Sequence, residues 1–134
     1  MEVLQTEDGG VPRIIVIRGQ RVILDHDLAK LYGVRTAALN QAVRRNPKRF
    51  PERFLLIVER KELKTLMSQN VTSKDPRGGP TKNAMAFTEH GALMVAAVLN
   101  SDRAVAMSIF VIEAFIRMRE EVAANSFILK RLAE

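Results

Sequence analysis

The chain has 134 residues, of which 47% are hydrophobic and 27% charged, with 7 glycines and 5 prolines. This length and composition are those of one compact globular domain that buries its own core, rather than of a disordered or fibrous chain. The chain has no cysteine, which excludes disulfides, thiolate metal sites and cysteine nucleophiles.

The net charge of +6 is concentrated in the middle of the chain. Residues 35–82 contain 12 Lys or Arg and 4 Asp or Glu, a net charge of +8, whereas the other residues contain 9 basic and 11 acidic ones, a net charge of −2. A clustered positive field attracts a polyanion, while scattered charge mainly aids solubility. The distribution therefore favours a nucleic acid as the partner.

Residues 1–12 are expected to form a flexible leader, because they are polar and acidic where a signal peptide would be basic and apolar. The longest apolar runs, such as residues 92–99, are shorter than the ~18 residues that span a bilayer. We expect a cytoplasmic protein that has no membrane contact, no cofactor and no small-molecule substrate.

A β-hairpin is predicted over Arg13–Leu24, with its turn at Gly19-Gln20. Asp25 is the expected N-cap of a short helix that Gly33 ends in the left-handed conformation. Three apolar residues of this helix share one face, namely Leu28, Leu31 and Tyr32.

A second short helix is predicted to begin at an N-cap, Thr36, and to stop at Asn46-Pro47. Its buried stripe consists of Leu39, Ala42 and Val43, and the rest of its surface is polar. A linker over residues 47–53 leads to Phe54–Val58, an apolar run that predicts a strand buried on both faces.

The remaining chain is predicted to be mainly helical. An amphipathic helix is expected over Glu59–Gln69 with Leu63, Leu66 and Met67 inward, and then an exposed loop over residues 70–83. A last strand, Ala84–Phe87, precedes a helix that Thr88 caps and that ends near Leu99; its apolar surface indicates a central place in the core.

A final long helix begins at Ser101-Asp102 and has an expected inner stripe of Val105, Ile109, Ile112 and Ile116, joined by Phe110, Phe115 and Met118. Residues 127–132 continue it as an amphipathic segment past an interruption at Asn125-Ser126. The elements together predict an α+β domain over residues 13–121, with a small antiparallel or mixed sheet and about five helices including a helix-turn-helix. Residues 122–134 are expected to form an amphipathic tail, which could begin a longer C-terminal region.

The helix-turn-helix is expected between Asp27 and Arg45. Such units need a small residue in the first helix and a glycine about four residues later, and Ala29, Gly33 and the apolar Val34 fill these places. Asn and Gln can bond adenine edges and Arg can bond guanine edges in the major groove. The residues expected to face outward and read bases are Ala37, Asn40, Gln41 and Arg44, with Arg45 toward one flank.

Other residues are expected to contact phosphates, which sets the register on DNA without reading its sequence. Thr36 lies at the helix start, where free N–H groups can hold a phosphate. Lys48, Arg49 and Arg53 follow the recognition helix, and a basic loop carries Lys74, Arg77 and Lys82. The alternative for the pair of helices is an ordinary helical hairpin with a solvated face, and for the loop a plain connection.

Other functions were weighed against DNA binding. His26 and His90 lie at separate helix starts with no third ligand nearby in sequence, so structural or surface roles are expected rather than catalysis or metal binding. The main rival is a protein-interaction or oligomerisation module that uses the apolar C-terminal helix, and a homodimer fits either function. A nuclease is the second rival, although the sequence shows no metal-binding carboxylate cluster.

Four ordered blocks of sequence carry a family resemblance. They are residues 15–22 (IVIRGQRV), 27–34 (DLAKLYGV), 49–54 (RFPERF) and 86–91 (AFTEHG). With these blocks, residues 13–120 resemble the phage "open reading frame six" N-terminal domain, a family similar to the KilA-N and Bro-N domains of phages and large DNA viruses. The resemblance implies a double-stranded-DNA-binding domain of phage or prophage origin in a bacterium, found in antirepressor-like regulatory proteins, with no catalytic residues to carry over.

Overall fold

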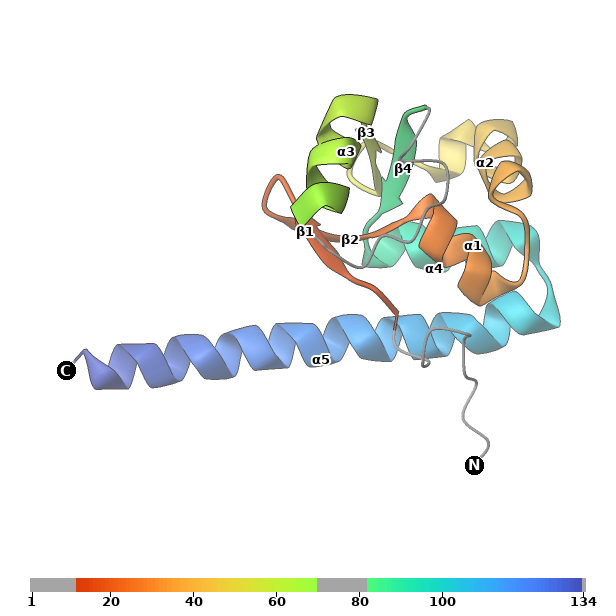
Figure 1. Cartoon of the computed structure of the whole chain (residues 1–134). Helices are drawn as coiled ribbons and strands as arrows, with labels where there is room; N and C mark the ends of the chain where they lie inside the picture. The colour runs from red at the N-terminus through yellow and green to blue at the C-terminus, as the bar shows by residue number, and fades with distance from the viewer. Residues whose placement is uncertain (1–11, 70–81, 134) are drawn as a thin grey trace.

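A four-stranded antiparallel sheet lies at the centre of the fold, and helices cover both of its faces (Figure 1). The computed structural model describes residues 12–69 and 82–133. The strands are β1 (Ile15–Ile17), β2 (Gln20–Leu24), β3 (Leu55–Val58) and β4 (Ala84–Phe87), in the spatial order β1-β2-β4-β3. The predicted α+β class is confirmed, and within the described residues every strand pair is antiparallel.

The helices are α1 (Asp25–Tyr32), α2 (Thr36–Arg45), α3 (Arg60–Gln69), α4 (Glu89–Leu99) and α5 (Asp102–Leu132), and a short 3-10 helix, η1 (Pro47–Arg49), follows α2. Alternation along the strands gives the sheet two apolar faces. Ile23 and Phe87 point into a large core with α1, α2, α4 and α5, whereas Val22 and Val58 point to a smaller core under α3.

Helix α4 runs through the large core, as its apolar surface predicts, and its N-terminus is fixed by a close backbone contact. Thr88 caps the helix by accepting a hydrogen bond from Gly91 N, and it donates from its own N and Oγ1 to Phe54 O at 3.0 and 3.1 Å. A Cβ on Gly91 would lie 2.0 Å from Phe54 O, so only glycine fits at this position. The predicted cap of the last helix is also confirmed, since Ser101 accepts from Ala104 N.

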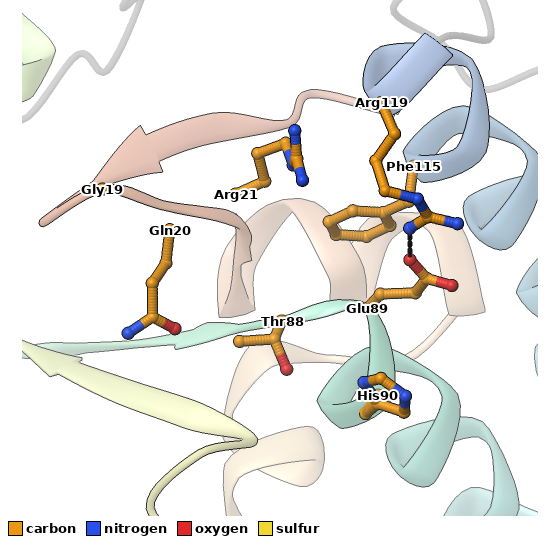
Figure 2. Close-up of a pocket in the computed structure, with 8 residues that line it drawn as sticks. All are labelled: Gly19, Gln20, Arg21, Thr88, Glu89, His90, Phe115 and Arg119. Atoms are coloured by element: carbon orange, nitrogen blue, oxygen red, sulfur yellow. Dashed lines mark hydrogen bonds and ion pairs between the residues drawn. The ribbon is translucent and has the colours of Figure 1, made fainter. Parts of the chain in front are cut away.

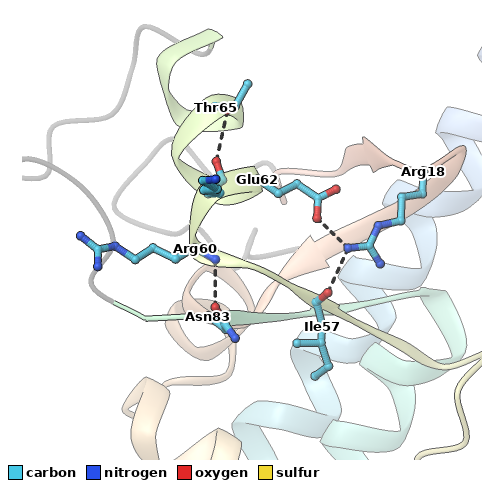
Figure 3. A network of polar contacts seen from close by, with 7 residues as sticks. Arg18, Ile57, Arg60, Glu62, Thr65 and Asn83 are labelled. Carbon is cyan, nitrogen blue, oxygen red and sulfur yellow. Dashed lines mark hydrogen bonds and ion pairs between the residues drawn. The ribbon is translucent and has the colours of Figure 1, made fainter.

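The hairpin is confirmed, but its turn is Arg18-Gly19 rather than Gly19-Gln20. Both turn residues have positive φ, 52° and 77°, as a two-residue hairpin with right-handed strand twist requires. The Arg18 guanidinium then pairs with Glu62 of α3 at 2.6 Å and donates to Ile57 O at 3.1 Å (Figure 3). Asn83, just before β4, accepts from Arg60 N at 2.9 Å, so the start of α3 is tied to the sheet (Figure 3).

Strand β3 differs from its prediction. It is an edge strand, and Ile57 is 50% exposed, so the expected burial on both faces is wrong. An apolar run cannot distinguish an edge strand from a central one, because the partner strand lies elsewhere in the sequence. In α3, Leu63 is buried and Leu66 half-buried as predicted; the side chain of Met67 and the loop over residues 70–81 lie outside the described residues.

The inner face of α5 is only partly the predicted one: Phe115 is buried and Phe110 packs against the core as expected, but most of the predicted stripe is not inward. The side chains that face the body are those of Ala104, Met107, Ser108, Val111, Ala114 and Phe115. Val105, Ile109 and Ile116 instead lie on the solvent side with 51%, 58% and 37% exposure. Three of these inner residues, Ala104, Ser108 and Ala114, are small, and they let α5 approach α1 and α4 closely.

Helix α5 continues without interruption past Asn125-Ser126 to Leu132, and its C-terminal part projects beyond the body (Figure 1). The expected break there is therefore wrong.

No helix within residues 12–69 and 82–133 is both long and apolar enough to cross a membrane.

Candidate nucleic-acid interface

Helices α1 and α2 are joined by a tight turn that begins at Gly33. Gly33 has φ +71°, and its N–H donates to Lys30 O at 3.3 Å, while Val34 N–H donates to Ala29 O at 3.0 Å. These two bonds close the C-terminus of α1 in a Schellman arrangement that favours glycine. Ala29 is only 1% exposed, as expected for the small residue where two helices approach each other.

An arginine near the start of α5 donates hydrogen bonds to the last turn of α1, next to Gly33. Arg103 of α5 donates from Nε to Leu31 O at 3.2 Å and from Nη2 to Lys30 O at 3.4 Å. A cation at a helix C-terminus stabilises the free carbonyl groups and the helix dipole. Nothing in the spacing of the residues identified Arg103 beforehand, because its partners lie more than 70 positions away.

A buried carboxylate joins α1, α2 and the sheet. Asp25 is 5% exposed, and its Oδ2 accepts from Asn40 Nδ2 and from Met85 N, both at 3.1 Å. Its Oδ1 accepts from His26 N at 2.6 Å. Asp25 is therefore the first residue of α1 and an interior acceptor, whereas the N-cap position is occupied by Leu24, which makes no side-chain cap.

The outward orientation expected for Asn40 is wrong. The side chain turns toward Asp25, and its Oδ1 is buried with no partner among the described residues. Helical periodicity alone placed Asn40 on the outer face, but a hydrogen bond to a buried carboxylate is stronger than one to a neutral group and holds it inward. Asn40 thus positions α2 against the sheet.

The start of α2 also differs from its prediction. Its N-cap is Arg35, without a side-chain cap, and Thr36 is the first helical residue. Thr36 is half-buried as a residue, and its hydroxyl lies 3.5 Å from Nδ1 of His26. The exposed Arg35, which the sequence reasoning did not include among the contact residues, stands where the chain enters α2; its basic side chain immediately before a helix start was the available signal.

The outer face of α2 is exposed and basic. Leu39 and Val43 are buried as predicted, while the exposed residues are Ala37, Ala38, Gln41, Arg44 and Arg45. In the described part of the chain, no acidic group pairs with Arg44 or Arg45. This face therefore presents uncompensated positive charge to the solvent.

The basic surface continues past α2. Lys48 and Arg49 are exposed on η1, which packs beside α2 (Figure 1), and Arg49 lies 4.0 Å from the sulfur of Met94. Arg53 is exposed, with its guanidinium 5.4 Å from the ring centre of Phe54. Lys82 is exposed as well, whereas Lys74 and Arg77 lie outside the described residues.

A separate shallow hollow of about 280 Å³ lies at the N-terminus of α4 (Figure 2). It contains the ion pair between Glu89 and Arg119, and His90 at its edge stacks on Phe54 with ring centres 5.7 Å apart. None of the residues expected to contact DNA lines it.

Across residues 12–69 and 82–133, no three His, Asp or Glu side chains gather in a way that could hold a metal ion.

Comparison with known protein families gives one match. The model of the ORF6N domain matches residues 12–98, which is more than half of the chain. No curated protein and no solved structure matches the chain. The matched range includes the sheet, the described residues of α1 to α3, nearly all of α4, and the exposed basic residues of α2 and η1. The chain therefore belongs to the ORF6N domain family.

Proposed function

We propose that this domain binds double-stranded DNA, with α2 in the major groove, as the DNA-binding part of a phage-type regulatory protein of the antirepressor-like kind. The observation that carries the proposal is the uncompensated basic face of α2, which continues into η1. A short helix held at a steep turn by Gly33 is the arrangement by which helix-turn-helix proteins present a recognition helix. Membership of the ORF6N family supports the phage-type regulatory context.

The exposed residues divide into two groups under this proposal. Gln41 and Arg44 lie on the outer face of α2, where an amide and a guanidinium can read adenine and guanine edges. Arg45, Lys48, Arg49 and Arg53 lie on or after the end of α2 and contact phosphates, and Arg35 and Thr36 do so at its start. Asn40 does not face the DNA under this proposal; it holds α2 in place through its hydrogen bond to Asp25.

The direct test is a fluorescence anisotropy titration of duplex DNA over a range of salt concentrations. Phosphate contacts release counterions, so the logarithm of the association constant should fall linearly with the logarithm of salt, by about 0.9 per contact. Lys48→Ala should reduce this slope by about 1. Arg117→Ala is the matched control, because it removes one charge from an exposed position of α5 and should leave the slope unchanged.

No binding to duplex DNA at low salt would refute the proposal, and an equal loss in the Arg117→Ala control would refute the placement of the interface on α2 and η1. Selection of bound sequences from a random duplex pool then tests sequence reading. Gln41→Ala and Arg44→Ala should each relax one position of the selected site, at a cost of about 1–3 kcal/mol for the preferred base.

A second candidate function is oligomerisation, which the exposed apolar residues of α5 support.

We also propose that the domain is not an enzyme. Incubation of labelled duplex with Mg²⁺ tests the nuclease alternative, and protein-dependent cleavage products would contradict this part of the proposal.

A further inference from the structure

The solvent side of α5 carries an apolar stripe, which consists of Val105, Ile109, Ile112 and Ile116. They are spaced four, three and four residues apart, which is the spacing of apolar residues in a helix that packs along a second helix. Val105 and Ile109 are more than half exposed, Ile116 is 37% exposed, and Ile112 is half-buried. Four β-branched side chains in one exposed row are a patch that a second surface can cover.

If the alternation of three- and four-residue steps is continued in both directions, it places one charged residue at each end of the stripe. Asp102 precedes Val105 by three residues, and Arg119 follows Ile116 by three. The row from Asp102 to Arg119 therefore has an acidic residue at one end, four apolar residues in the middle and a basic residue at the other end. When two such rows run in opposite directions, each acidic end lies beside a basic end.

We propose that two copies of this chain pair through the stripe, with their α5 helices antiparallel. In this register Ile109 of one copy faces Ile112 of the other, and Val105 faces Ile116. The arrangement sets Asp102 opposite Arg119 of the second copy at both ends. A parallel pair would instead place like charges opposite each other, which is unfavourable.

The arrangement leaves room for both bodies. Of the side chains that α5 buries in its own body, Met107 and Ala114 lie on the opposite side of the helix from the stripe, whereas Phe115 flanks it. The sheet and the other helices all lie on that buried side of α5 (Figure 1). Two bodies would thus flank the helix pair from outside, related by a two-fold axis, and each contact would occur twice.

Arg119 can serve the pairing while it keeps its contact within the chain. Its side chain is 45% exposed although it pairs with Glu89. A guanidinium has five N–H donors in a fork, so it can bond two carboxylates at once. The proposal rests on the second candidate function, oligomerisation, and specifies its surface and arrangement; it needs no DNA, so it and the DNA-binding proposal can each fail without the other.

Sedimentation equilibrium of the full chain without DNA tests the pairing. We expect a reversible dimer at about 100 μM that dissociates on dilution, as a modest helix pair should. Ile109→Glu buries two unpaired carboxylates in the pair and should weaken dimerisation at least about 100-fold. Leu93→Glu is the matched control, because Leu93 is an apolar α4 residue with 44% exposure, and this variant should still dimerise.

A monomer at all concentrations overturns the proposal, as does a dimer that survives Ile109→Glu or is lost in the control. Disulfide formation gives an independent measurement, since the natural chain has no cysteine. A mixture of Val105→Cys and Ile116→Cys chains should cross-link rapidly to each other. Neither variant should cross-link rapidly to itself, because its two sulfurs would lie about 16 Å apart along the helix pair.

The cross-linking control is a mixture of Ala106→Cys and Arg117→Cys chains, which lie within about 3 Å of the same level along the pair but beside the stripe. This mixture should react slowly. Rapid self-linking of Ile112→Cys chains together with slow mixed linking of Val105→Cys and Ile116→Cys would show a parallel pair, and so would overturn the antiparallel arrangement.

Discussion

The carboxylate of Asp25 and the amide of Asn40 lie 3.1 Å apart in the interior, where they connect the first residue of α1 to the middle of α2. The same carboxylate oxygen accepts from Met85 N of β4. The orientation of α2 on the sheet therefore depends on a polar contact as well as on the burial of Leu39 and Val43. This relationship separates the residues that hold α2 in place from the residues on its exposed face, which we propose contact DNA.

Asn40→Ala should lower the free energy of unfolding by about 2 kcal/mol, because it removes a hydrogen bond to a buried carboxylate. It should weaken binding to all DNA sequences alike. Gln41→Ala, on the exposed face, should leave stability within about 0.5 kcal/mol and change sequence preference instead. Urea denaturation and binding to a panel of duplexes measure the two effects, and a shifted preference with unchanged stability in Asn40→Ala would contradict the inward role.

Gly33→Ala should destabilise the fold by more than about 1 kcal/mol, since φ there is +71° and a Cβ would lie 2.6 Å from Cδ of Arg103. Arg103→Ala removes that steric conflict along with the bonds to the end of α1. The glycine substitution should therefore cost less in the Arg103→Ala background, where only the backbone strain remains. A double-mutant cycle by urea denaturation checks this; strictly additive effects would show that the two residues do not interact.

Gly91→Ala should cost about 3 kcal/mol or more, because its Cβ would meet the Phe54 carbonyl at 2.0 Å and backbone cannot move aside cheaply. Gly19→Ala is the comparison. Gly19, unlike Gly91, has a positive φ of 77°, but open space surrounds the position, so a cost of about 1 kcal/mol is expected. Thermal unfolding ranks the two variants, and similar melting temperatures would contradict the tight contact between α4 and the segment before β3.

Tyr32 should make the domain sensitive to alkali. Its hydroxyl is buried and donates to Ala92 O at 2.8 Å, and burial raises its pKa above the ordinary value. The native state then holds the proton at pH values where the unfolded chain has lost it, so this contribution to stability is complete below about pH 10 and falls as the pH rises further. Tyr32 is the single tyrosine and the chain has no tryptophan, so phenolate absorbance reports this group alone.

Phenolate absorbance and helical circular dichroism should therefore change together in an alkaline titration. Tyr32→Phe should remove this part of the alkaline loss while it lowers stability at neutral pH by about 1 kcal/mol. Phenolate formation in a fully folded domain near pH 10 would contradict the burial of the hydroxyl.

Local chemistry accounts for the features that could be predicted. The caps at Thr88 and Ser101 and the turn at Gly33 depend on neighbouring residues, and each is where the sequence placed it. The buried stripes of α1 and α2 also follow from spacing, since each of these short helices has one apolar face. The exposed charges after α2 were predictable because lysine and arginine rarely bury without a partner.

Features that depend on distant partners could not be predicted. Helix α5 has two apolar faces, and periodicity cannot say which one meets the body; the structure selects the face with Ala104 and Ala114 because it permits close packing. The inward turn of Asn40 depends on Asp25, and the role of Arg103 depends on α1. Spacing within one element carries no information on either contact.

The hydrogen bonds from Arg103 to the carbonyls of Leu31 and Lys30 connect the start of α5 to the last turn of α1, directly before the turn at Gly33 that leads to α2. Any partner that favours a shifted α5 must also favour a changed turn at Gly33, because the guanidinium spans both. By thermodynamic reciprocity, a ligand on α2 would alter the affinity of that partner by the same factor. Arg103 thus couples the start of α5 to the end of α1, and Arg103→Ala should weaken this coupling.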